Sequence, residues 1–142
     1  MKKILLMCLV VGLVGCVTAP VQNNERKPLS NDRILSYKEK TEINNSKIIV
    51  TRDSGFLGGG CYYGFWVDGK LTARFDTRET AEFFIPEGER VLRAGRDPYG
   101  KGLCAVDQSN WTQIETIVSP EKAKTFRLSL DLNGRPAIQR EN

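Results

Sequence analysis

The sequence predicts an all-β fold, a small antiparallel β-sandwich of about seven or eight short strands over residues 46–142. Short runs of apolar, β-branched and aromatic residues alternate there with Gly, Pro, Asn and Asp. No run in this range has the 3.6-residue apolar spacing of an amphipathic helix. The chain of 142 residues is long enough for one such domain and a segment ahead of it.

The predicted strands follow one another at short intervals. They are residues 47–52, 61–67, 70–75, 81–85, 90–94, 111–118, 126–132 and 136–140. Asp68-Gly69 and Asn133-Gly134 each lie between two runs, and both dipeptides favour two-residue hairpin turns because they tolerate positive φ angles. Pro86-Glu87-Gly88 predicts a further turn. The most regular alternation is at 126–132, where Phe or Leu occupies every second position.

The composition excludes several classes of function. The chain has no histidine, so neither Ser-His-Asp nor Cys-His catalysis nor His-ligated metal is open to it. The formal charge is +4, but residues 1–15 hold two of the 21 basic residues and none of the 17 acidic ones. Without them 19 basic residues face 17 acidic ones, which gives no argument for nucleic-acid binding.

Residues 1–15 have the pattern of a signal peptide. Lys2 and Lys3 precede a mainly apolar run at 4–14, and about eleven residues are too few to cross a bilayer as a helix. The run ends in Leu13-Val14-Gly15-Cys16, which resembles the lipobox of bacterial lipoproteins. The alternative is an ordinary secretory signal cleaved near Thr18-Ala19, with Cys16 incidental.

The lipobox resemblance implies that the Cys16 thiol receives a diacylglyceryl group and that cleavage before Cys16 frees an amino group for acylation. Such a chain stays on a membrane. Val17 stands where inner-membrane lipoproteins of this family usually carry Asp, so we expect the outer membrane, on its periplasmic face. Residues 16–45 are polar, with Pro20 and Pro28, and predict a lipidated amino terminus with a flexible tether that holds the domain off the membrane.

Cys61 and Cys104 remain once residues 1–16 are set aside. An even pair in an exported chain predicts a disulfide. Closing a loop of this length contributes about 4 kcal/mol in the chain-entropy model. A redox pair or a metal site is the alternative, but the chain has neither a histidine nor a C-x-x-C spacing to support one.

Part of the domain resembles known envelope proteins. The motifs are Ile48-Ile49-Val50, Val67-Asp68-Gly69-Lys70, Phe84-Ile85-Pro86-Glu87-Gly88 and Val91-Leu92. Together they are similar to a β-sandwich family of uncharacterised bacterial lipoproteins, and the hairpin and turn also occur in surface modules of the PEGA type. Here Glu87 interrupts the usual Pro-Gly pair. The resemblance implies a sandwich in the cell envelope and brings no catalytic residue or cofactor with it.

Two loops supply the candidate binding residues. The loop at 55–60 lacks the G-K-[ST] of a phosphate cradle, so we interpret it as a flexible or contact loop. The predicted disulfide would join it to the loop at 95–102. The resulting rim is expected to contain Phe56, Leu57, Tyr62, Arg96, Tyr99 and Lys101. Aromatic side chains beside Arg and Lys suit protein or glycan contacts.

Other candidate residues receive simpler interpretations. Trp66 and Trp111 are expected in the core, since aromatic residues of a small sandwich usually fill it. The pairs Glu79 with Glu82 and Glu87 with Glu89 are interpreted as solvated charges rather than as acid–base catalysts.

The sequence therefore predicts an envelope lipoprotein that acts as a non-catalytic binding or accessory module, with no cofactor and no metal. Its expected partners are the membrane, through the lipid, and an envelope protein, with glycan or peptidoglycan as the alternative ligand. A second hypothesis is a lipoprotein from a mobile element that blocks phage or conjugation. A third is a hydrolase without histidine that uses carboxylates.

Overall fold

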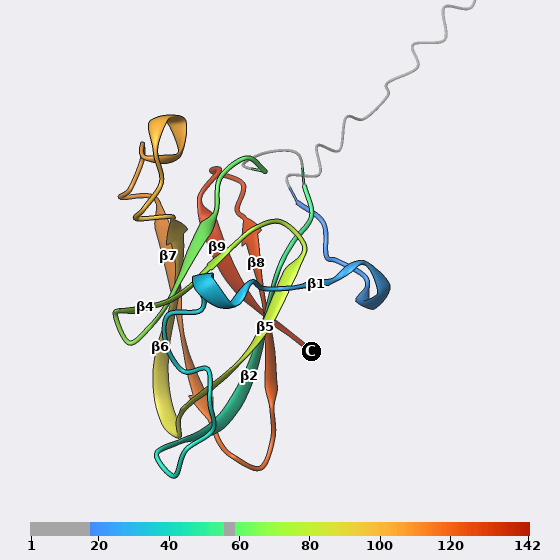
Figure 1. Ribbon diagram of the computed structural model, residues 1–142, viewed down its shortest axis with the longest axis vertical. Coiled ribbons are helices and arrows are strands. Elements are labelled where there is room, and N and C mark those ends of the chain that lie inside the picture. Colours follow the sequence, from blue (N-terminus) through green and yellow to red (C-terminus); the bar gives the residue numbers. More distant parts are fainter. Residues whose placement is uncertain (1–17, 56–58) are drawn as a thin grey trace, which may run out of the picture.

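The computed structural model describes residues 18–55 and 59–142, and it confirms the all-β sandwich (Figure 1). The five-stranded sheet has the order β1 (Lys27–Pro28), β5 (Glu79–Pro86), β2 (Asn44–Arg52), β8 (Lys124–Leu130), β9 (Pro136–Glu141). The four-stranded sheet has the order β4 (Lys70–Phe75), β3 (Tyr63–Val67), β6 (Gly88–Arg96), β7 (Trp111–Val118). Three short 3-10 turns complete it: η1 (Asn23–Glu25), η2 (Asn31–Arg33) and η3 (Gly102–Cys104).

The core lies between the two sheets. Inward-facing residues of the central strands are fully buried, including Val50 on β2 and Phe126 on β8. Three phenylalanines meet at its centre: Phe65, Phe75 and Phe83 have ring centroids 5.5–6.3 Å apart. These rings come from both sheets, so they hold the sheets together.

The hairpin turns form where the sequence predicts them. Asp68 and Gly69 both have positive φ, at 48° and 79°, and join β3 to β4. Gly134 also has positive φ and lies between β8 and β9. The predicted turn at 86–88 is different, because only Glu87 separates β5 from β6. There the chain crosses from one sheet to the other, with Gly88 at φ 98°.

The sandwich is not antiparallel throughout. β2 pairs antiparallel with β5 on one side and parallel with β8 on the other, and β1 is parallel to β5. The parallel pair of β2 and β8 arises because the chain completes β7 in one sheet before crossing to the other. Parallel strands need such a long connection.

Residues 18–45, expected to form a flexible tether, pack along the sandwich instead. Ala19 pairs with Ser54, and β1 adds to the edge of β5. Val21 and Leu29 are buried, and Leu29 belongs to the core cluster. The buried apolar residues of this segment are too widely spaced to show a period, and Ile34 and Tyr37 also pack against the core cluster. No helix among residues 18–55 and 59–142 is long and apolar enough to cross a membrane.

Candidate binding surface

The predicted disulfide is present and joins two loops at one end of the four-stranded sheet. Cys61 precedes β3, and Cys104 lies in the loop between β6 and β7, with their Cα atoms 5.4 Å apart. The loop around η3 projects beyond the sheets (Figure 1). It exposes Leu103 and Val106, and Tyr99 is 61% exposed. The disulfide therefore fixes an apolar, solvent-exposed tip to the sandwich.

The structure brings together three of the predicted rim residues. Tyr62, Tyr99 and Lys101 line one open hollow of about 430 Å³ beside the disulfide. Phe56 and Leu57 lie outside the described residues. Arg96 does not belong to the hollow. It lies two positions after Ala94 on β6 and opposite Tyr63, which places it on the inner face of the sheet by strand alternation.

An ion pair orders this hollow. The guanidinium of Arg74 donates two hydrogen bonds to the carboxylate of Asp97, at 2.8 and 2.7 Å. Asp97 is almost fully buried and also accepts a bond from the backbone N–H of Tyr99. Hydrogen bonding to Asp97 raises the pKa of Arg74 above its usual value. Arg74 lies 5.3 Å from the ring centroid of Tyr62 and 5.0 Å from that of Tyr99.

The amino-terminal segment contributes a second guanidinium to this region. Arg33 in η2 donates two hydrogen bonds to Glu79, at 2.5 and 2.6 Å, and lies 4.6 Å from the ring centroid of Tyr62. The hydrogen bond with Glu79 raises the pKa of Arg33. Glu79 is thus a buried partner rather than the solvated charge that the sequence suggested. Glu82 pairs with Lys47 instead, so the two acids do not form a catalytic pair.

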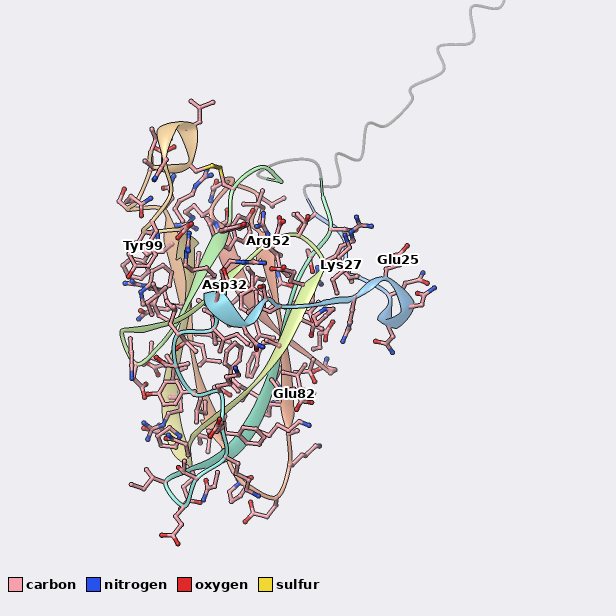
Figure 2. The ribbon with its side chains drawn as sticks, viewed as in Figure 1. Glu25, Lys27, Asp32, Arg52, Glu82 and Tyr99 are labelled. Atoms are coloured by element: carbon pink, nitrogen blue, oxygen red, sulfur yellow. A yellow bond between two sulfur atoms is a disulfide. The ribbon has the colours of Figure 1, made fainter. Side chains whose placement is uncertain are left out.

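A buried arginine holds the backbone at the disulfide in place. Arg52 is 1% exposed, and its Nη1 donates to the carbonyl oxygens of Cys61 and Phe75, at 2.6 and 2.8 Å (Figure 2). Its guanidinium lies 3.5 Å from the ring centroid of Tyr63. Burial lowers the pKa of Arg52. These bonds fix the backbone at the entry to β3 and therefore the position of Tyr62.

The outer face of the four-stranded sheet carries both tryptophans. Trp66 and Trp111 were expected in the core. Trp66 is buried, but it lies outside the cluster between the sheets, and Trp111 is exposed. Trp66 is 8% exposed because its ring lies flat on the sheet over Gly64 and Gly95. Trp111 is 41% exposed, on the outward side of β7. The sequence signal for this arrangement is the glycine at each of two neighbouring strand positions, which leaves room for a large ring.

Arg93 lies between the two tryptophans. Its guanidinium carbon is 4.2 Å from the ring centroid of Trp66 and 5.1 Å from that of Trp111. No carboxylate pairs with it among residues 18–55 and 59–142. The Nε atom of Arg93 is buried without a hydrogen-bond partner, but an arginine held between aromatic faces keeps its charge.

These side chains form one continuous surface. Arg74, Gly64, Gly95 and Trp111 are direct neighbours across β4, β3, β6 and β7. Tyr62 and Tyr99 extend the surface toward the disulfide. We call this surface the aromatic–arginine row; it consists of Tyr62, Trp66, Arg74, Arg93, Tyr99 and Trp111. In the described part of the chain no three Cys, Asp or Glu side chains gather as metal ligands.

Comparison with protein-family models, with curated proteins and with solved structures gives no match to this chain. The resemblances to the lipobox and to the PEGA-type sandwich therefore stay predictions from the sequence.

Proposed function

We propose that the protein is an exported lipoprotein, anchored through Cys16, whose folded domain is a non-catalytic module that binds another protein of the cell envelope. The observation that carries the proposal is the aromatic–arginine row. Tyr99 and Trp111 are exposed on it, beside the half-buried Tyr62, Arg74 and Arg93, and Trp, Tyr and Arg are the residue types that dominate the binding energy of protein interfaces.

The composition of the row favours a protein over a glycan. A sugar ring stacks on a free aromatic face, but guanidinium groups already cover the faces here. Arg93 lies over Trp66, and Arg33 and Arg74 lie over Tyr62. What remains available is the charge of Arg93, the exposed part of Trp111 and the apolar tip beside the disulfide. A protein surface with a carboxylate flanked by apolar side chains complements this set.

The start of the domain supports an anchor close to the membrane. Thr18 donates a hydrogen bond from its hydroxyl to Asp53, at 3.0 Å, and Arg127 holds the same carboxylate through two bonds. Two residues reach at most ~7 Å, so a lipidated Cys16 would hold the domain directly at the membrane surface. Because residues 18–45 pack on the sandwich, they do not form the flexible tether that the sequence suggested.

Affinity capture from envelopes cross-linked in the cell tests the partner-binding proposal. We expect the wild-type chain to enrich one protein. Trp111→Ala should reduce that enrichment more than tenfold, because truncation of an interface tryptophan costs about 2 kcal/mol or more. Leu132→Ala is the matched control: Leu132 is 96% exposed in the β8–β9 hairpin and should change nothing. Equal enrichment by Trp111→Ala, or no enriched protein with the wild type, would overturn the proposal.

Metabolic labelling with palmitate tests the anchor separately. The wild-type chain should incorporate label and sediment with membranes, and Cys16→Ala should incorporate none, because that substitution removes the thiol that is acylated. Cys104→Ala serves as the control, since Cys104 is committed to the disulfide. Label on the Cys16→Ala chain, or none on the wild type, would show that Cys16 is not the anchor.

A further inference from the structure

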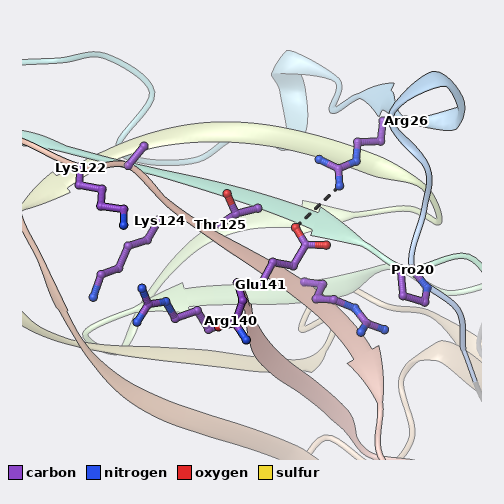
Figure 3. Close-up of a pocket in the computed structure, with 10 residues that line it drawn as sticks. Pro20, Arg26, Lys122, Lys124, Thr125, Arg140 and Glu141 are labelled. Carbon is purple, nitrogen blue, oxygen red and sulfur yellow. Dashed lines mark ion pairs between the residues drawn. The ribbon is translucent and has the colours of Figure 1, made fainter.

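A strongly basic pocket lies on the side of the sandwich formed by the amino-terminal segment and the ends of β8 and β9 (Figure 3). It is an open hollow of about 680 Å³. Its charged lining side chains are Arg26, Lys122, Lys124, Arg127, Arg140 and Glu141. Cations thus outnumber carboxylates five to one among the side chains of its wall, and such a surface attracts anions.

Three of these cations already form contacts within the protein. Arg26 lies 3.7 Å from Glu141, and Arg127 is held by Asp53. Lys124 donates to the carbonyl oxygen of Ile117 and to the Thr116 hydroxyl. These contacts fix three positive charges in place around the hollow. Preorganised charges lose little side-chain entropy when a ligand binds.

The other two cations of the pocket, Lys122 and Arg140, have no such contacts. Neither Lys122 nor Arg140 forms an ion pair or a side-chain hydrogen bond with any residue of the described ranges. Figure 3 shows Lys122, Lys124 and Arg140 gathered on one side of the pocket, away from the Arg26–Glu141 pair. Lys124 and Arg140 also line the neighbouring hollow toward β6 and β7. Several ammonium and guanidinium donors converging in one hollow match the oxygen atoms of a phosphate group.

The pocket is close to the proposed anchor. Pro20 forms part of its wall and lies four residues after Cys16. Four residues span at most ~14 Å, and the headgroup layer of a leaflet is itself roughly 5–8 Å thick. A lipid-anchored chain therefore holds the pocket within reach of headgroup phosphates. The aromatic–arginine row belongs to the other sheet, so a ligand in the pocket does not cover it.

We propose that this pocket binds the phosphate group of an anionic membrane lipid. The inference deepens the proposed function, because it relies on the anchor at Cys16 to bring the pocket to the membrane. The phosphate chemistry itself does not depend on lipidation. Inorganic phosphate would use the same donors, and the experiment below separates the two sources.

Calorimetric titration of the purified full chain in neutral maltoside micelles tests the pocket. The probes are dihexanoyl phosphatidylglycerol, its zwitterionic phosphatidylcholine analogue, and inorganic phosphate. We expect saturable binding of the anionic lipid, weaker binding of inorganic phosphate and little binding of the zwitterionic lipid. Lys122→Gln with Arg140→Gln should weaken binding of the anionic lipid about 25-fold, roughly fivefold for each cation removed. The charge-matched control is Lys38→Gln with Lys40→Gln, at two exposed lysines that do not line the pocket, and it should bind as the wild type does.

The outcomes are distinguishable from those of the anchoring test. Equal binding by both double variants would overturn the pocket, as would equal affinity for the zwitterionic lipid. Inorganic phosphate binding as tightly as the anionic lipid would overturn the lipid assignment. A palmitate-labelled chain that fails to bind any probe refutes the pocket and leaves the anchor standing. Binding by a chain that carries no label supports the pocket and refutes the anchor.

Discussion

Gly64 shows how one residue sets the character of the binding surface. A Cβ atom at this position would lie 2.3 Å from Cη2 of Trp66, far inside van der Waals contact. The absence of a side chain therefore allows the indole ring to lie flat on the sheet, where Arg93 covers it. Gly95 on the neighbouring strand leaves room for the same ring.

Gly64→Ala should consequently disturb the surface as well as the stability of the domain. The added methyl group forces the Trp66 ring off the sheet, and overpacking of this kind costs about 1–3 kcal/mol. Gly60→Ala is the matched control, because a Cβ there meets no atom within 4 Å. Urea unfolding followed by tryptophan fluorescence measures both effects. Identical midpoints and spectra for the two variants would contradict the assigned role of Gly64.

At the scale of elements, the segment at 18–45 is part of the folded domain. It supplies β1 to the edge of the five-stranded sheet, Leu29 to the core and Arg33 to the contacts around Tyr62. These contacts come from residues far apart in the segment. The segment therefore connects the edge of the five-stranded sheet to the region around Tyr62.

Leu29→Ala tests whether this segment contributes to stability. Leu29 is 6% exposed, and truncation of a buried leucine costs about 2–5 kcal/mol. Leu35→Ala makes the same chemical change at a side chain that is 45% exposed and should cost much less. Chemical denaturation of the two variants gives the comparison. Equal, small losses of stability would show that the segment is a tether after all.

The sequence predicted most of the strands because their residues alternate between core and solvent. The alternation at 126–132 is the clearest case and corresponds to β8, and the Asp68-Gly69 turn forms between β3 and β4 as expected. It did not predict the docking of residues 18–45, since buried apolar side chains as far apart as Val21 and Leu29 produce no period. Nor did it predict the outward-facing tryptophans, because the room for Trp66 comes from glycines on two strands that pair only in the folded sheet.

At the scale of the whole molecule, the proposed membrane contact and the proposed partner binding lie on different sheets. The five-stranded sheet carries the chain entry at Thr18 and the basic pocket, and these are the features that suit a membrane surface. The four-stranded sheet carries the aromatic–arginine row on its opposite, outward face. An anchored domain in this orientation presents the row away from the membrane. That arrangement leaves the row accessible to another protein.

Site-specific photocross-linking in the cell tests whether the aromatic–arginine row is the partner-binding surface. A photoreactive amino acid replaces Gln113, which is exposed beside Arg93 on the four-stranded sheet, or Glu82, which is exposed on the five-stranded sheet. We expect one discrete cross-linked protein from position 113 and none of that species from position 82. Cross-links to the same protein from both positions, or none from position 113, would contradict this assignment of the surface.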